Sequence, residues 1–202
     1  MTIRLVLVTH ASTSATQDAR FPADESLDAR GAGLAADASG ALRRMDQVFR
    51  GPEARCAETA AALGLPASAS ASASAALADL DLGAWRGRTL ADLESERPAE
   101  LLSWLTDPDS APHGGESLGA LTERVSAWLD ALPPGPSRIA AVTHPAVVRA
   151  AVLRVIGAPL TCFWRLDTGP LTQTWLSHHG GRWQLRETGH PLVRSASDGL
   201  GL

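Results

Sequence analysis

The chain has 202 residues, of which 45% are hydrophobic and 20% charged, and its formal net charge is −4. This composition is ordinary for a soluble globular protein, and we expect residues 1–202 to form a single domain with a full core. The acidic balance argues against nucleic acid as a partner. All 18 basic residues are arginine, which excludes a Schiff-base lysine and a P-loop lysine.

Cysteine usage and hydrophobic runs limit the alternatives further. Cys56 and Cys162 are the only cysteines and show no paired metal-binding spacing, so we expect neither a disulfide scaffold nor a structural zinc site. No apolar run reaches the roughly 18 residues of a membrane span, and Arg4 interrupts the first apolar stretch. We therefore expect a cytoplasmic protein without a membrane partner. Nothing in the sequence indicates its oligomeric state.

The first half of the chain mixes strand-like and helical patterns. Residues 3–8 form a short apolar run that is typical of a buried strand. A helical pattern covers residues 34–49, and a second helix begins near Cys56 and continues through residues 58–63. The alternation of Ala and Ser over residues 66–76 supplies side chains too small to fill a core, which indicates a surface connection or a weak edge strand.

Two helical regions follow in the middle of the chain. Thr89 with Asp92 three residues later resembles a capping box, which predicts a helix through Leu105 with a break at Pro98. The clearest amphipathic helix opens at Ser117. Its apolar positions recur at helical spacing, at Leu118, Leu121, Val125, Trp128, Leu129 and Leu132. The proline-rich stretch that begins at Pro133 then ends it.

The last third of the chain predicts a strand over residues 139–142, a helix over residues 146–156, and a terminal hairpin. The hairpin strands cover residues 171–178 and 183–187, on either side of a Gly-Gly turn. Strands that alternate with helices and end in a hairpin predict a three-layer α/β/α fold. Its sheet is mostly parallel with an antiparallel edge.

Two of the predicted strands end in the same way. Residues 3–8 lead into Thr9-His10, and residues 139–142 lead into Thr143-His144. In an open parallel sheet, ligands bind outside the carboxyl ends of the strands. The two histidines, 134 positions apart, are therefore predicted to meet over one site. The alternative is that each histidine only caps its own strand with a hydrogen bond.

Motifs along nearly the whole chain resemble the branch of the histidine phosphatase superfamily that contains cofactor-dependent phosphoglycerate mutases and small-molecule phosphatases. The matches occur in the family's order, at residues 9–11, Arg20, and residues 27–31, 51–60, 77–87, 115–117 and 143–144. The resemblance implies a phosphoglycerate mutase-like fold. It also implies a phosphate-accepting histidine, which is His10 in this chain, a phosphate-binding Arg55 and a second histidine, His144.

The chemistry of these residue types agrees with the resemblance. A phosphoryl group needs positive donors, an in-line nucleophile and a leaving-group acid. A neutral imidazole is a competent nucleophile, and the guanidinium of Arg55 suits two phosphate oxygens. Asp79 is the first choice for the proton donor, which would require a raised pKa, and Asp81 is the second. Alternation along a strand would place both on one face, which weakens the distinction between them, and a solvated loop acid is the alternative for either.

The remaining candidates are substrate-binding residues, and several depart from the family's pattern. Arg20 stands near the expected site, and Glu116 with Ser117 forms the family's Gly-Glu-Ser element. Thr9 replaces an arginine, which removes one guanidinium from the phosphate pocket. Pro145 replaces a glycine and removes a backbone N–H that could have pointed at the phosphate.

The leading hypothesis is a phosphomonoester hydrolase that acts on a small phosphorylated metabolite through phospho-His10, needs no cofactor and has an impaired phosphate pocket. One alternative is a degenerate relative that binds an anion or a partner, and another is an enzyme of a different reaction in the same cleft. A metal hydrolase that uses His10, His144 and an aspartate is a weaker alternative, because zinc ligands usually have tighter spacing. No metal is therefore predicted.

Overall fold

The computed structural model describes residues 2–42, 44–65, 71–133, 135 and 137–192. In these residues one six-stranded sheet has the strand order β3-β2-β4-β1-β5-β6. The strands are β1 (Ile3–Thr9), β2 (Gln47–Arg50), β3 (Ala71–Ala73), β4 (Ser137–Thr143), β5 (Thr172–His179) and β6 (Arg182–Pro191). The pairs from β3 to β1 are parallel, whereas β5 and β6 form an antiparallel edge. The predicted mixed sheet is confirmed.

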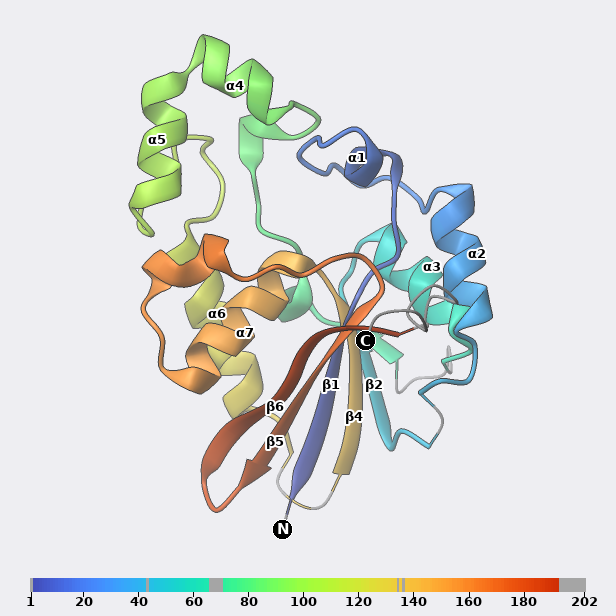
Figure 1. The fold of residues 1–202 in the computed structure, drawn as a ribbon. Coiled ribbons are helices and arrows are strands. Elements are labelled where there is room, and N and C mark those ends of the chain that lie inside the picture. The colour runs from blue at the N-terminus through green and yellow to red at the C-terminus, as the bar shows by residue number, and fades with distance from the viewer. Residues whose placement is uncertain (1, 43, 66–70, 134, 136, 193–202) are drawn as a thin grey trace, which may run out of the picture.

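Helices cover both faces of this sheet, as Figure 1 shows. Helices α2 and α3 lie on one face, and α6 and α7 lie on the other. The α-helices are α1 (Ser14–Gln17), α2 (Ala29–Asp37), α3 (Ala54–Ala62), α4 (Leu90–Glu96), α5 (Pro98–Thr106), α6 (Leu118–Asp130) and α7 (Pro145–Ile156). Three short 3₁₀ helices are η1 (Ala75–Leu77), η2 (Gly83–Trp85) and η3 (Leu160–Arg165). The fold is the predicted three-layer α/β/α arrangement.

Strand β1 is buried on both sides because its apolar run has no polar face. Leu5 and Leu7 pack into the core that contains α6 and α7, while Val6 and Val8 pack into the core beside α2 and α3. Successive side chains of a strand point to opposite faces, so one continuous apolar run supplies both cores. The same sequence feature places the carboxyl end of β1 at the centre of the sheet.

The prediction of one helix over residues 34–49 is wrong. Helix α2 ends at Asp37, and the chain turns through Gly40 (φ 81°) and Arg44 (φ 67°) before it enters β2. Left-handed backbone conformations cannot continue an α-helix. Val48 is buried as part of a strand that pairs with both β3 and β4, so pairing within the sheet outweighs the local helical pattern.

The other elements largely follow their sequence signals. Thr89 and Asp92 form the predicted capping box of α4, and Pro98 occupies the first turn of α5 after the break. The amphipathic helix α6 begins after Ser117, whose hydroxyl accepts a hydrogen bond from the Ala120 N–H. Of the predicted Ala/Ser stretch, residues 66–70 lie outside the described residues, and the remainder contains β3 at the sheet edge and η1. In the part of the chain that the structure describes, no helix is long and apolar enough to cross a membrane.

Candidate active site

The two histidines of the repeated Val-Thr-His pattern come together at the carboxyl edge of the sheet. Strands β1 and β4 are parallel neighbours, and Thr9 pairs with Thr143. The His10 backbone N–H donates to the Thr143 carbonyl at 2.9 Å, which fixes the relative position of the two strand ends. The imidazole centroids of His10 and His144 are 5.2 Å apart, with an interplanar angle of 61°. The two histidines therefore meet at one edge of the sheet, as their repeated sequence pattern predicts.

Arg55 and Asp79 complete this cluster. Arg55 lies in the first turn of α3, which follows β2, and it is only 1% exposed. Its guanidinium donates to the carbonyl of Ala23 at 2.7 Å and to Oδ2 of Asp79 at 2.8 Å. Asp79 stands in the irregular segment between η1 and η2. The structure thus brings four residues predicted to be catalytic, His10, Arg55, Asp79 and His144, into one group.

His10 is held as a neutral imidazole. Burial lowers its pKa, and the charges of His144 and Arg55 lower it further, to about 4. Nδ1 lies 2.7 Å from the carbonyl oxygen of Ala11, and because a carbonyl only accepts, Nδ1 must carry the proton. Nε2 is then left with a free lone pair, the form that a nucleophilic histidine requires.

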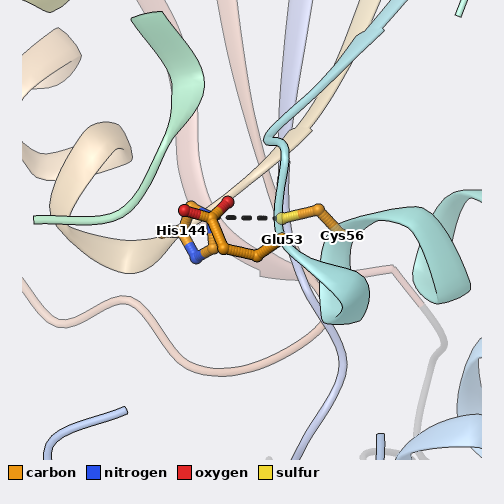
Figure 2. A group of neighbouring side chains, drawn as sticks. All are labelled: Glu53, Cys56 and His144. Carbon is orange, nitrogen blue, oxygen red and sulfur yellow. Dashed lines mark hydrogen bonds and ion pairs between the residues drawn. The ribbon is translucent and has the colours of Figure 1, made fainter. Parts of the chain in front are cut away.

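His144 is held as an imidazolium. Burial alone would lower its pKa, but the Asp79 carboxylate and hydrogen bonds with Cys56 and Glu53 outweigh burial and raise the pKa to about 10. Its Nε2 donates to Oε2 of Glu53 at 2.7 Å and lies 3.3 Å from the Cys56 sulfur (Figure 2). Nδ1 is 3.3 Å from Oδ2 of Asp79, but at an angle that makes no hydrogen bond, so this buried N–H has no hydrogen-bond partner among the described residues.

The group in Figure 2 is also the set of side chains in the described residues with the spacing of metal ligands. Glu53, Cys56 and His144 each offer one ligand atom, and these atoms lie within 4.8 Å of one another. Nitrogen, sulfur and carboxylate ligands of this kind suit Zn²⁺. Such binding would require His144 to lose the proton that the neighbouring carboxylates stabilise. The arrangement fits an imidazolium with two hydrogen-bond acceptors better than a preformed metal site.

The pKa of Asp79 differs from the sequence-based expectation. Burial would raise it, but the charges of His144 and Arg55 outweigh burial and hold the pKa below its usual value. Asp79 is therefore a carboxylate, because two cations face it. Asp81 does not share its face: it lies in a loop, pairs with Arg86 at 2.7 Å and is half exposed. Strand alternation does not apply, because residues 78–82 are irregular.

A cavity of about 260 Å³ opens over His10 and Asp79. Both residues line it, whereas His144 and Arg55 lie behind them, at 0% and 1% exposure. The Asp79 carboxylate therefore lies against the two cations, His144 and Arg55, that a phosphoryl group would need as partners. A bound phosphate would have to compete with this ion pair.

Two of the residues predicted to bind substrate line the same cavity. Arg20 is at the rim, where its half-exposed guanidinium forms an ion pair with Asp18. Pro145 occupies the first turn of α7, directly after His144, and contributes an apolar surface to the wall. Sequence reasoning placed both near the site, and the structure brings both there.

The structure does not bring Thr9 to the cavity, contrary to the prediction that it binds substrate. Thr9 is fully buried, and its hydroxyl donates to the carbonyl of Gly169 at 2.7 Å. The same oxygen accepts from the Thr172 N–H at 2.9 Å. Because these bonds tie the end of β1 to the segment before β5, Thr9 anchors the sheet edge instead of leaving an empty place for a guanidinium.

Glu116 and Ser117 also lie away from His10, and their contacts are structural. Ser117 caps α6, and Glu116 forms an ion pair with Arg124 at 2.6 Å. Arg124 in turn donates to the carbonyls of Ala76 and Asp79, at 2.9 and 3.4 Å. Glu116 therefore helps to hold the backbone that carries Asp79, and neither Glu116 nor Ser117 lines the cavity over His10.

Sequence reasoning missed the contribution of Glu53 and Cys56. Both lie at the start of α3, directly after β2, at the sheet edge where His144 lies (Figure 2). Gly51 leaves the space they need, since a Cβ at that position would lie 2.8 Å from Oε2 of Glu53 and 2.9 Å from Nε2 of His144. Both residues lie in the stretch 51–60 that carries part of the family resemblance, and this stretch was the available signal.

Comparison with known proteins agrees with this geometry. The family model described as the histidine phosphatase superfamily (branch 1) matches residues 5–190. Over 190 residues the chain is 27% identical to a glucosyl-3-phosphoglycerate phosphatase of Mycolicibacterium vanbaalenii, and the match covers 88% of this chain and 84% of that protein. The native structure of mycobacterial glucosyl-3-phosphoglycerate phosphatase is similar with a TM-score of 0.80 at 26% identity, covering 94% of this chain and 100% of that chain. A structure named mycobacterial hydrolase 1 gives a TM-score of 0.82 at 26% identity, covering 95% of this chain and 100% of that one.

Proposed function

The chain belongs to the histidine phosphatase superfamily (branch 1), and from this premise we propose that it hydrolyses a phosphomonoester of a small metabolite through a phosphohistidine on His10. One observation carries the proposal: a neutral imidazole with a free Nε2 lies 5.2 Å from a protonated one, with a buried guanidinium beside them. This combination of nucleophile and fixed positive charge is what phosphoryl transfer requires.

The reaction has two steps. Nε2 of His10 attacks phosphorus and forms a P–N bond while the P–O bond to the leaving alcohol breaks, and that oxygen takes up a proton. Water then attacks phosphorus, the P–N bond breaks, and inorganic phosphate leaves. The N–H of His144 and the guanidinium of Arg55 stabilise the negative charge on the phosphoryl oxygens in both steps. The unpartnered Nδ1 of His144 and Nε of Arg55 are the donors that remain for these oxygens.

Asp79 becomes the proton donor only when substrate is bound. In the structure its pKa is low because two cations, His144 and Arg55, face it. A phosphate dianion that displaces Asp79 from those cations removes their effect and adds a repelling charge beside it, so the pKa of Asp79 rises and the carboxyl takes up a proton. The protonated acid then serves the leaving oxygen in the first step, and its carboxylate accepts the proton of water in the second.

The comparisons support the general activity. The relatives with this fold and sequence similarity are named for the dephosphorylation of glucosyl-3-phosphoglycerate, a small phosphorylated metabolite. The chain is accordingly a phosphatase of this family in the general sense, and its own substrate is a separate question.

The deciding experiment detects the phosphoenzyme. Wild-type protein is mixed with p-nitrophenyl phosphate, quenched in alkali, where phosphohistidine survives, and analysed by intact mass. We expect one added phosphoryl group that is lost in His10→Ala, whereas the matched surface variant His190→Ala retains it. Hydrolysis that survives in His10→Ala would refute the mechanism.

A second candidate function is that of a binding protein that turns over poorly. It is favoured by Thr9, which stands where the family has an arginine and whose hydroxyl is engaged with Gly169. The same experiment decides between the two. Vanadate or phosphate binding without phosphoenzyme and without hydrolysis, across a broad panel of phosphomonoesters, would establish the binding protein.

A further inference from the structure

The cavity beyond His10 has an aromatic wall. Four rings line it, each in contact with the next, in the spatial order Phe21, Trp104, Trp164 and Phe163. The centroids of successive rings are 5.6, 4.4 and 4.9 Å apart. They come from three separate parts of the chain: the segment after α1, helix α5, and η3. A continuous aromatic surface favours a flat apolar group stacked against it.

The same wall contains polar atoms that have no partner in the described residues. The indole N–H groups of Trp104 and Trp164 and the hydroxyl of Thr168 are buried without a hydrogen bond. Trp104 and Thr168 are only 3% and 6% exposed, and all three side chains line the cavity. Buried donors normally find an acceptor, so three unused donors around one cavity indicate a ligand that brings acceptor oxygens.

Arg149 supplies a positive charge on this side of the cavity. Its guanidinium carbon lies 5.7 Å from the Phe163 ring centroid and 5.8 Å from that of Trp164, and its Nε donates to the carbonyl of Leu166 at 2.8 Å. Among the described residues no carboxylate lies within ion-pair distance of it, and its terminal nitrogens make no hydrogen bond. Arg149 is half buried and stays charged, so this planar fork is available for an anion.

We infer that the phosphate ester taken by this site carries an aromatic ring with a carboxylate, the ring against Trp104 and Trp164 and the carboxylate on Arg149. The assignment concerns the leaving group and rests on the proposed phosphatase function. A polyhydroxylated leaving group fits less well, because its oxygens can accept from the three donors but it brings neither a charge for Arg149 nor a flat apolar face for the aromatic wall. Specificity in this chain therefore differs from that implied by the name of its glucosyl-3-phosphoglycerate phosphatase relatives.

Binding of phosphonates tests the inference without requiring turnover, since their C–P bond resists hydrolysis. Calorimetry compares three compounds: benzylphosphonate, 4-carboxybenzylphosphonate and 3,4-dihydroxybutylphosphonate. We expect the carboxybenzyl compound to bind roughly tenfold to a hundredfold more tightly than the benzyl compound, the range that a charged hydrogen bond contributes. The dihydroxybutyl compound should bind most weakly.

Variants assign this preference to Arg149. Arg149→Met keeps an unbranched apolar side chain and removes the charge, and should abolish the advantage of the carboxylate without weakening benzylphosphonate. Arg154→Met is the matched control on the same helix, because Arg154 is exposed and faces Asp130 at 3.6 Å. If thermal melting shows that Arg149→Met is unfolded, Arg149→Lys replaces it and should reduce the advantage only in part, since the ammonium lacks the planar fork.

Three outcomes would overturn the inference: equal affinity for the two aromatic compounds, tightest binding of the dihydroxybutyl compound, or equal weakening of all three in Arg149→Met. The last would place the phosphonate itself on Arg149. Failure of the proposed function is recognised separately. A clear carboxylate preference in a protein that forms no phosphoenzyme would refute the phosphatase and leave the ligand class standing.

Discussion

Besides Asp79, a glutamate that is 91 positions away in the chain raises the pKa of His144. Oε2 of Glu53 accepts from Nε2 of His144 at 2.7 Å. Glu53→Gln removes the negative charge but retains an amide oxygen able to accept the same bond. A hydrogen bond between charged groups contributes about 1.5–3 kcal/mol, and one pKa unit corresponds to about 1.4 kcal/mol. We therefore expect the pKa of His144 to fall by roughly one to two units, from about 10 in the wild type.

An NMR pH titration of the imidazole Cε1–H signals measures this shift directly, with the His144 signal assigned by its loss in His144→Gln. If the imidazolium is the active form, the pH at which kcat/KM falls on the alkaline side decreases by the same number of pH units as the His144 pKa. Glu58→Gln is the control, because Glu58 lies on the same helix but accepts from the Leu27 N–H. An unchanged His144 pKa in Glu53→Gln, or an equal shift in Glu58→Gln, would refute the assignment of this charge to Glu53.

Three further predictions concern stability and proton donation. Urea denaturation across pH should find maximal stability near the unfolded histidine pKa of about 6.5. Toward pH 10 the free energy of unfolding falls because folded His144, whose pKa is raised to about 10, releases its proton. Toward pH 4 it falls because the unfolded chain protonates His10 more readily than the folded protein, where the pKa of His10 is about 4. A flat profile would contradict both assignments. Asp79→Asn should reduce kcat/KM far more for an alkyl phosphate than for p-nitrophenyl phosphate, whose leaving group needs little protonation, and equal losses would remove Asp79 from the acid role. Thr9→Val should lower the free energy of unfolding by about 1–3 kcal/mol, because the Gly169 carbonyl and Thr172 N–H lose their partner, whereas Thr9→Ser should lower it much less; equal stability of the two variants would show that these hydrogen bonds are unimportant.

Local signals in the sequence were sufficient for the architecture. The apolar runs that end at Thr9 and Thr143 predict buried strands, and their identical endings anticipate the pairing that brings His10 and His144 together. Helix starts at Thr89 and Ser117 follow from side-chain caps, which act within three residues. Such signals can be read from the sequence because the groups that interact are close in the chain.

The helix that was wrongly predicted over residues 34–49 has the opposite cause, because contacts distant in the chain decide the structure there. Residues 34–49 carry a helical pattern, yet β2 forms at residues 47–50 because the sheet offers pairing with β4 and burial of Val48. A partner strand some ninety residues away decides the outcome, and no local pattern contains that information.

The chemistry of the site depends on the tertiary structure. The sequence identified His10, Arg55, Asp79 and His144 as candidates, but their protonation follows from burial and from neighbours supplied by distant segments. Asp79 and Glu53 together help to make His144 a cation, and His144 and Arg55 keep Asp79 a carboxylate. Residue type determines which groups can titrate, whereas the charge that each one carries depends on distances of a few ångströms that exist only after the chain has folded.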